Sequence, residues 1–199
     1  SLGFFTDANQ AVIWRGAMAS KALNQLLFDA AWGDLDFLLI DLPPGTGDIH
    51  LSIVQAIPLT GALIVSTPQN IALADAKRGI AMFKQENINV PVLGLIENMS
   101  YFTPEDLPNN KYYIFGKDGA KNLASDLGTA LLGEIPLVQS IREASDAGHP
   151  VSLQDNTPLE ESYKTIAKNM VEELIKRNKN LPATEIVKIT AMVAACSTK

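Results

Sequence analysis

The residues best suited to chemistry are in the octamer DLPPGTGD, residues 41–48, which follows the apolar run FLLI. An aspartate at the end of a buried strand can hold a Mg²⁺ shell, and open α/β sheets bind ligands at that edge. Two prolines stiffen the loop that follows, while Gly45 and Gly47 permit positive φ and close approach to a phosphate. The octamer therefore predicts a Walker B and switch arrangement, with Asp41 for Mg²⁺ and Gly45 for a terminal phosphate.

A tight turn between strand and helix, with Asp41 as a turn acid, is the simpler interpretation of the same residues. For a single aspartate after a strand we would favour it. Two prolines and two glycines packed around two acids are more specific than a turn requires.

Other phosphate-binding patterns fit the sequence poorly. GTGDIH places a histidine where the dinucleotide fingerprint needs its third glycine, and Asp41 precedes these glycines rather than following them. The nearest match to a P-loop is GTALLGEI, residues 128–135, where Glu134 occupies the position of the lysine. A carboxylate beside phosphates would repel them, so we reject this match, and the sequence lacks the lysine-bearing loop that Asp41 would normally face.

The elements that must position these residues alternate along the chain. Four apolar runs predict strands of a parallel sheet that is covered on both faces; they span residues 37–42, 61–67, 90–99 and 130–136. Five stretches with helical spacing predict helices over 18–31, 49–57, 71–86, 120–127 and 159–177. The fold class is therefore α/β, with an open, mostly parallel sheet flanked by helices.

Local signals add detail to this outline. Gly128 is expected to end the fourth helix, and Thr157 with Pro158 to begin the fifth. Turn residues and aromatic residues in 102–116 indicate a loop or hairpin excursion. The tail, residues 181–199, reads as a weak strand or a weak helix, and the sequence does not decide between them.

Composition excludes several classes of function. A net charge of −6 argues against a broad nucleic-acid surface, which needs clustered Lys and Arg. A single cysteine, Cys196, allows no internal disulfide and is typical of a reducing cytoplasm. No run of apolar residues approaches the ~20 residues that span a bilayer, and Lys188 is the lone cation of the stretch TEIVKITAMVAAC, so membrane binding is not expected.

Five segments together resemble one family. VIWRGAMASKALNQLL, WGDLDFLLIDLPPGTGDIHLS, VSTPQNIALADAKRGIAMF, VLGLIENMSYF and LLGEIPLVQSIREASDAGHPV follow in order from about Leu2 to Lys176. They are similar to the Mrp/ApbC family, which are MinD/ParA-like P-loop ATPases that act as iron–sulfur cluster carriers. The resemblance implies a P-loop NTPase fold whose first βα unit or units, with the Walker A loop, lie upstream of this chain. Residues 1–180 would then form the C-terminal part of the domain, with 181–199 as a tail.

The resemblance also implies roles for individual residues. Asp41 matches the Walker B acid, which acts on Mg²⁺ through water, and Gly45 matches the switch glycine near the γ-phosphate, with Pro44 beside it. Asn98 matches the residue that reads the adenine edge, and Pro136 matches the loop that lines the base. Without the family resemblance, we would interpret Asn98 as the cap of a turn rather than as a nucleotide-binding residue.

Arg142, in SIREASDAG, has two interpretations. It either approaches the nucleotide or forms salt bridges with Glu143 or Asp146, and the sequence favours neither.

The sequence departs from the family pattern at the segment where the family binds its iron–sulfur cluster. In the family, a Cys-x-x-Cys pair follows the segment ENMSYF. In this sequence TPED follows that segment, and residues 102–116 contain no cysteine. We therefore predict no iron–sulfur ligands here. Two functions remain open. One is a part of an ATP·Mg²⁺-dependent, homodimeric iron–sulfur carrier with client or scaffold proteins as partners. The other is a nucleotide-switched protein-binding module that carries no cluster.

Overall fold

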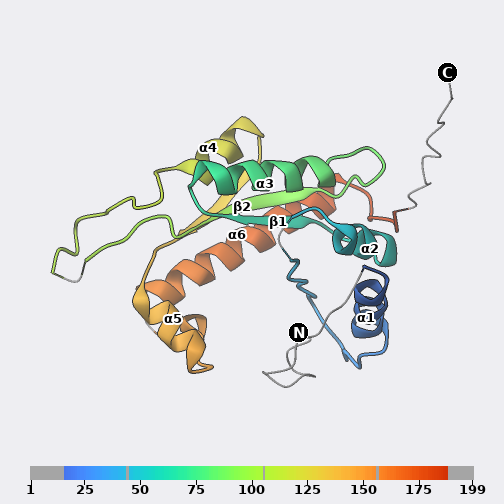
Figure 1. Cartoon of the computed structure of the whole chain (residues 1–199), viewed down its shortest axis with the longest axis horizontal. Helices are drawn as coiled ribbons and strands as arrows, with labels where there is room; N and C mark the ends of the chain where they lie inside the picture. Colours follow the sequence, from blue (N-terminus) through green and yellow to red (C-terminus); the bar gives the residue numbers. More distant parts are fainter. Residues whose placement is uncertain (1–15, 44, 105, 156, 188–199) are drawn as a thin grey trace.

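The computed structural model describes residues 16–43, 45–104, 106–155 and 157–187. Its centre is a parallel sheet in the order β1-β2-β3, formed by β1 (Ala62–Ser66), β2 (Val92–Asn98) and β3 (Ala130–Ile135) (Figure 1). These strands confirm the predictions for 61–67, 90–99 and 130–136. All three are rich in Leu, Ile and Val, as expected for strands covered on both faces.

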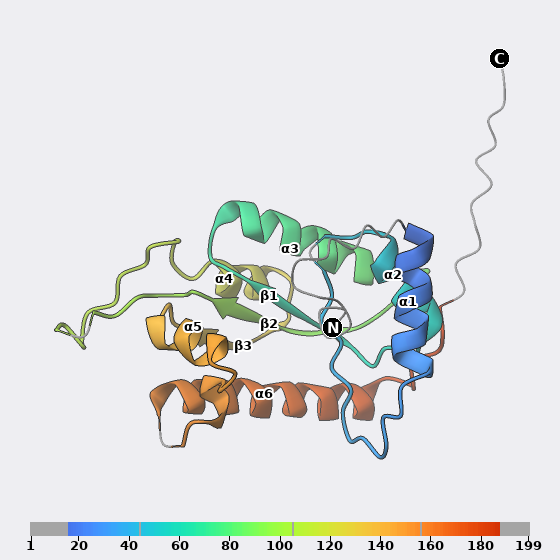
Figure 2. The ribbon, with the colours of Figure 1, turned by 60° about the horizontal axis from the view of Figure 1, so that its bottom comes forward.

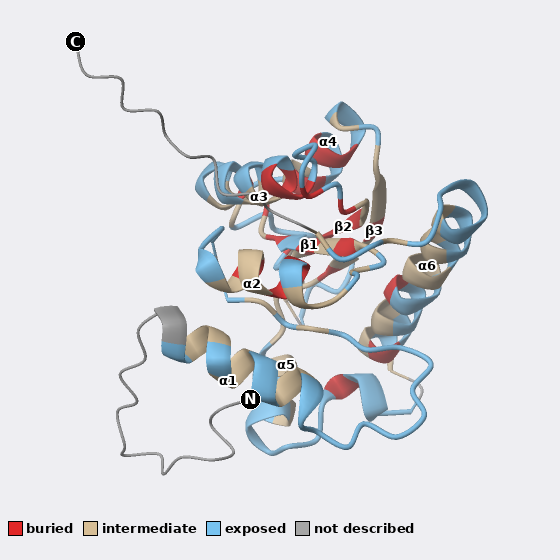
Figure 3. Ribbon diagram, turned by 90° about the vertical axis from the view of Figure 1, so that its right-hand side faces the viewer, coloured by how far each residue is buried: buried red, intermediate tan, exposed pale blue. Residues whose placement is uncertain are grey.

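Helices cover both faces of the sheet, as Figure 2 shows. α3 (Asn70–Phe83) and α4 (Gly119–Asp126) lie on one face, and α6 (Pro158–Asn180) crosses the other. The first face holds the larger core, in which Ile80 and Phe83 of α3 pack with Leu95 of β2. The second core joins Leu132 of β3 to Ile166 of α6. Figure 3 shows the buried residues gathered along the sheet-facing sides of these helices.

Two predicted helix boundaries are confirmed in atomic detail. Thr157 caps α6, since its hydroxyl accepts the backbone N–H of Glu160 at 3.1 Å, and Pro158 begins the helix. Gly128 follows the end of α4 with a φ of +61°, a conformation that favours glycine. Local sequence therefore determines where these two helices begin and end.

A pair of helices, α1 (Gly16–Phe28) and α2 (Asp48–Ala56), lies at one end of the sheet (Figure 1). Ser20 and Ser52 join them through their hydroxyls at 2.8 Å. Val54 of α2 is part of the larger core, and its carbonyl accepts the backbone N–H of Val187 from the segment after α6. The hydrogen bond joins α2 to the segment after α6, while Val54 packs α2 into the larger core.

An excursion leaves the sheet between β2 and α4 and extends far from the body of the molecule (Figure 1). Phe102 and Tyr112 form an antiparallel bridge near its base, with both backbone hydrogen bonds at 2.8 Å. The hairpin excursion predicted for 102–116 is therefore confirmed. Two further elements follow β3, namely α5 (Gln139–Asp146) and the 3₁₀ turn Val151–Leu153, and the helical periodicity had not indicated either of them.

The predicted strand at 37–42 is wrong. These residues form no strand, and Phe37 and Leu39 are 51% and 73% exposed. A strand needs a neighbour to satisfy its backbone groups, and no segment of the described residues pairs with this one. Asp41 therefore follows an extended, exposed segment rather than the end of a strand.

The tail is only partly described. Residues 181–187 contain neither helix nor strand, and 188–199, with Lys188 and Cys196, lie outside the described residues. None of the helices in the described part of the chain has both the length and the apolar character needed to cross a membrane.

Candidate nucleotide site

The octamer forms an exposed loop that runs into the first turn of α2. Asp41 and Gly45 are both exposed, and Pro44 lies outside the described residues. Gly45 has a φ of +96° with nothing within 4 Å of where a Cβ would stand, so only the backbone conformation requires glycine here. The open space on that side leaves the backbone of Gly45 accessible to a ligand such as a phosphate.

The loop ends at the N-terminus of α2. Gly47 is the N-cap of the helix and has no side chain to accept a backbone N–H of the first turn, where Asp48 stands. His50, two residues on, donates its backbone N–H to the carbonyl of Gly47 at 3.1 Å and is 5% exposed. Burial lowers the pKa of His50 from 6.5, although the backbone carbonyls of Gly47 and Pro43 act in the opposite direction.

Asn98 and Pro136 are neighbours at the carboxyl edge of the sheet. Asn98 ends β2 opposite Ile135 of β3, and Pro136 follows Ile135 directly. The Asn98 Oδ1 accepts the backbone N–H of Met99 at 2.9 Å, which is the turn cap that the simpler interpretation predicts. Its amide nitrogen donates no hydrogen bond within the described ranges, so its two N–H groups have no acceptor there.

Met99, next to Asn98, has a φ of +53°. A non-glycine residue in the left-handed region is uncommon, and such strain concentrates at functional positions. The strained turn changes the direction of the chain immediately after Asn98.

Glu97 is fully buried at the same edge, and we did not predict it from the sequence. Its Oε1 accepts the hydroxyl of Ser100 at 2.7 Å, and its Oε2 accepts the backbone N–H of Ala120 at 2.6 Å. Ala120 is in the first turn of α4, where a negative charge is favourable. Glu97 therefore joins the end of β2 to the start of α4 beneath the excursion. An acid within the apolar run VLGLIEN is the sequence signal that could have identified it.

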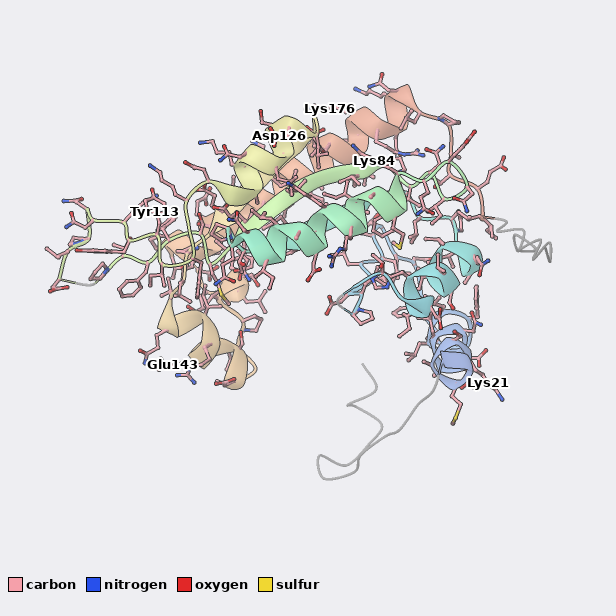
Figure 4. The ribbon with its side chains drawn as sticks, turned by 45° about the horizontal axis from the view of Figure 1, so that its top comes forward. Lys21, Lys84, Tyr113, Asp126, Glu143 and Lys176 are labelled. Atoms are coloured by element: carbon pink, nitrogen blue, oxygen red, sulfur yellow. The ribbon has the colours of Figure 1, made fainter. Side chains whose placement is uncertain are left out.

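Arg142 lies on α5, where it pairs with its own neighbours. Its guanidinium contacts Asp146 at 2.8 Å and Glu143 at 3.1 Å, and all three side chains are exposed. Figure 4 shows Glu143 on α5, away from the sheet. The structure therefore contains the salt bridges that the second interpretation of Arg142 predicts.

The predicted site residues fall into two groups. Asn98 and Pro136 are brought together at the ends of β2 and β3, whereas Asp41 and Gly45 lie in the loop before α2. Across the described ranges, no hydrogen bond or ion pair joins one group to the other.

The sheet edge also carries a cavity that contains none of the predicted residues. It has a volume of about 340 Å³ and lies between α3, α4 and the end of the excursion, where Asn70, Lys77, Lys117 and Asn122 line it. Among the described residues there is no group of three or more His, Cys, Asp or Glu side chains that could hold a metal ion.

A family model and known proteins match most of this chain. The model is the ParA model described as NUBPL iron-transfer P-loop NTPase, and it matches residues 1–171. The iron-sulfur cluster transfer protein NUBPL of Dictyostelium discoideum is 49% identical over 175 residues, which are 87% of this chain and 53% of that protein. The iron-sulfur cluster carrier protein of Escherichia coli K12 is 44% identical over 183 residues, 92% of this chain and 49% of that protein. The chain therefore spans about half the length of these curated relatives.

Solved structures agree on the fold. A nucleotide-binding protein from Archaeoglobus fulgidus, in complex with ADP, is 37% identical and matches with a TM-score of 0.60 over 70% of this chain and 55% of that one. The cell division ATPase MinD of Pyrococcus furiosus is 22% identical, and with a TM-score of 0.55 over 81% of this chain and 63% of that one it supports the fold alone. The parallel sheet, the helices on both of its faces and these matches assign the chain to the ParA family, in the group described as NUBPL iron-transfer P-loop NTPases.

Proposed function

We propose that this chain is part of an ATP-binding protein that transfers iron–sulfur clusters to client proteins. The observation that supports this most strongly is the similarity to iron–sulfur carrier and transfer proteins at 44–49% identity over most of the chain. The exposed loop at Gly45 and the free amide of Asn98 fit the two ends of a nucleotide, namely phosphate and base.

The proposed roles follow from the chemistry of each residue. Asp41, an exposed carboxylate, holds Mg²⁺ through water, and the open backbone at Gly45 faces the terminal phosphate. Asn98 donates its amide N–H groups to adenine, while Pro136 packs against the base. Pro44 stiffens the phosphate-facing loop. Mg²⁺, when bound, would neutralise part of the negative charge on the phosphates.

Arg142 contributes less to this proposal. Its ion pairs with Glu143 and Asp146 occupy the guanidinium, so an approach to the nucleotide would require both to open. We therefore place Arg142 at the border of the site rather than in it.

Tight nucleotide binding needs a P-loop, and the 199-residue sequence contains none. We expect the 199-residue chain by itself to bind ATP·Mg²⁺ weakly. Isothermal titration calorimetry tests this expectation. Micromolar affinity of the chain alone would contradict our assignment of Asp41 and Gly45 to only part of a phosphate site.

A second function is favoured by one specific observation. Residues 102–116, where the family's Cys-x-x-Cys pair is expected, contain no cysteine, and the sequence holds only Cys196. One thiol per chain gives two ligands in a homodimer, which is fewer than the four that an ordinary cluster needs. The alternative is therefore a homodimeric, nucleotide-switched module that binds a partner protein without carrying a cluster.

Anaerobic reconstitution with iron and sulfide separates the two functions. The sample is the protein in the longest form that its gene encodes, with Cys196→Ser as the matched variant. Labile iron and sulfide in stoichiometric amounts support the carrier function, and their loss in Cys196→Ser would assign that thiol to the cluster. Absence of bound iron, together with ATP-dependent dimerisation measured by light scattering, supports the module instead.

A further inference from the structure

The cavity between α3, α4 and the end of the excursion has no part in the function proposed above. Its volume of about 340 Å³ is within the range of sites that hold small molecules. The buried side chains of Leu73 and Leu123 line its inner part. Exposed polar and charged residues line it where it opens to solvent, among them Asn70, Lys77, Lys117 and Asn122. A cavity of this composition suits a ligand that combines an apolar body with a polar group.

Closely packed backbone forms one wall of this cavity. At Gly119, the first residue of α4, a Cβ would lie 2.5 Å from the carbonyl oxygen of Pro68, and at Gly116 it would lie 3.3 Å from the same oxygen. The end of the excursion therefore packs directly against the loop between β1 and α3. Gly116 also has a φ of +107°, a conformation that favours glycine. Because these backbone segments already touch, the cavity needs little rearrangement to bind a ligand.

Two lysines give the opening of the cavity a positive charge. Lys77 comes from α3 and Lys117 from the end of the excursion. In the part of the chain that the structure describes, neither ammonium group forms an ion pair. The Nζ of Lys117 lies 5.1 Å from the centre of the Tyr113 ring, a cation–π contact that orients the charge without neutralising it. Among the described residues that line the cavity Asp126 is the only acid, so the lining has a net positive charge.

The sign of this charge is opposite to that of the molecule. The whole chain has a net charge of −6, and the charged residues of a second cavity, beside β3 and α6, are Glu134 and Glu161. The second cavity therefore repels an anion, whereas the two lysines attract one to the first cavity. Asn70 and Asn122 add amide N–H groups that can donate hydrogen bonds to the oxygens of an anion.

We propose that the cavity between α3, α4 and the excursion binds a small organic anion, in which a carboxylate or phosphate group is attached to an apolar body. Lys77 and Lys117 attract the anionic group, and the apolar body packs against Leu73 and Leu123. A ligand held in this way links α3 to the excursion. The proposal is independent of the nucleotide site, because none of the described residues to which we assign nucleotide contacts lines this cavity.

NMR titrations of the ¹⁵N-labelled 199-residue chain test the proposal with four probes. Phenyl phosphate and benzoate each join an anion to an apolar ring, whereas inorganic phosphate and acetate have the anion alone. Saturable shift changes are expected at the backbone amides of residues 116–122 and at the side-chain amides of Asn70 and Asn122. Each ring probe is expected to bind about tenfold more tightly than its counterpart without a ring, because the ring leaves water. The tighter of the two ring probes shows whether the site prefers phosphate or carboxylate, and either preference supports the proposal.

Three lysine variants locate the binding site. Lys77→Gln and Lys117→Gln each remove one charge from the cavity and are expected to weaken binding of the tighter ring probe about threefold to tenfold. Lys84→Gln is the matched control, since Lys84 is exposed at the end of α3 that lies away from the excursion (Figure 4). The control should bind the probe as the wild type does. All three lysines are exposed, so each variant is expected to fold, and circular dichroism checks this.

Three results would overturn the proposal. The first is the absence of saturable shift changes around the cavity with any probe up to about 10 mM, a concentration that detects even weak binding. The second is equal affinity of Lys77→Gln, Lys117→Gln and Lys84→Gln for the ring probe. The third is equal affinity of the ring probes and their counterparts without a ring. Failure of nucleotide binding in a separate experiment would leave these results unchanged, so the two proposals fail independently.

Discussion

The carboxylate of Glu97 accepts the backbone N–H of Ala120 at 2.6 Å, across 23 positions of sequence. Its other oxygen accepts the hydroxyl of Ser100 at 2.7 Å. These two contacts lie on either side of the base of the excursion, which leaves the sheet after β2 and returns at α4 (Figure 1). A single buried acid thus fixes where the excursion begins and ends.

Glu97→Gln is expected to destabilise the fold by about 1–3 kcal/mol, because an amide nitrogen cannot accept the hydrogen bond that one of the carboxylate oxygens accepts. Denaturation by urea, followed by circular dichroism, measures the free energy of unfolding. Glu86→Gln is the control, since Glu86 is exposed after α3 and its substitution should have little effect. Equal stability of the two variants would show that Glu97 makes no net contribution.

Substitution by alanine is expected to have opposite effects on stability at Gly119 and Gly79. A Cβ at Gly119 would lie 2.5 Å from the carbonyl oxygen of Pro68, a backbone atom that cannot easily move, so Gly119→Ala is expected to destabilise the fold by about 1–3 kcal/mol. Gly79 is inside α3 with nothing within 4 Å, so Gly79→Ala should stabilise it by about 0.5–1 kcal/mol. Thermal unfolding compares the two variants, and a lower melting temperature for Gly79→Ala than for Gly119→Ala would contradict the packing of α4 on Pro68.

The lowered pKa of His50 predicts how the stability of the fold depends on pH. Its pKa in the folded protein is lowered below 6.5 by burial, so the unfolded chain binds a proton more readily than the folded one. The contribution of neutral His50 to stability is therefore complete above pH 6.5 and declines as the pH falls through 6.5 towards the lower pKa of the folded state. Urea titrations at several pH values should show a smaller decline below pH 6.5 in His50→Gln than in the wild type. Parallel curves for the two proteins would contradict the buried, neutral state of the ring.

Much of the fold could be predicted from the sequence because its signals are local. The apolar runs that became β1, β2 and β3, and the cap formed by Thr157, act through neighbouring residues. Residues 37–42 have the same apolar character, but a strand also depends on a partner that its own sequence does not specify, so this prediction failed.

The candidate site could be predicted less well. The octamer, Asn98 and Pro136 are visible as motifs, and they remain predictions as ligand-binding residues. Glu97 was missed because its importance comes from burial and from a distant backbone partner, Ala120. Tertiary contacts of this kind leave only a weak trace in a single sequence, namely one polar residue within an apolar pattern.

The most direct test of the proposed nucleotide site is Mg²⁺-dependent binding of a fluorescent ATP analogue to the longest form of the protein. The two variants are Asp41→Asn and Asp48→Asn, since both acids are exposed, one in the loop and one in the first turn of α2, and each substitution removes one negative charge. The account predicts that Asp41→Asn loses the enhancement of affinity by Mg²⁺, while Asp48→Asn retains it. Equal Mg²⁺ enhancement in wild type and Asp41→Asn would contradict the assignment of Asp41 to the magnesium ion, and with it the proposed nucleotide site.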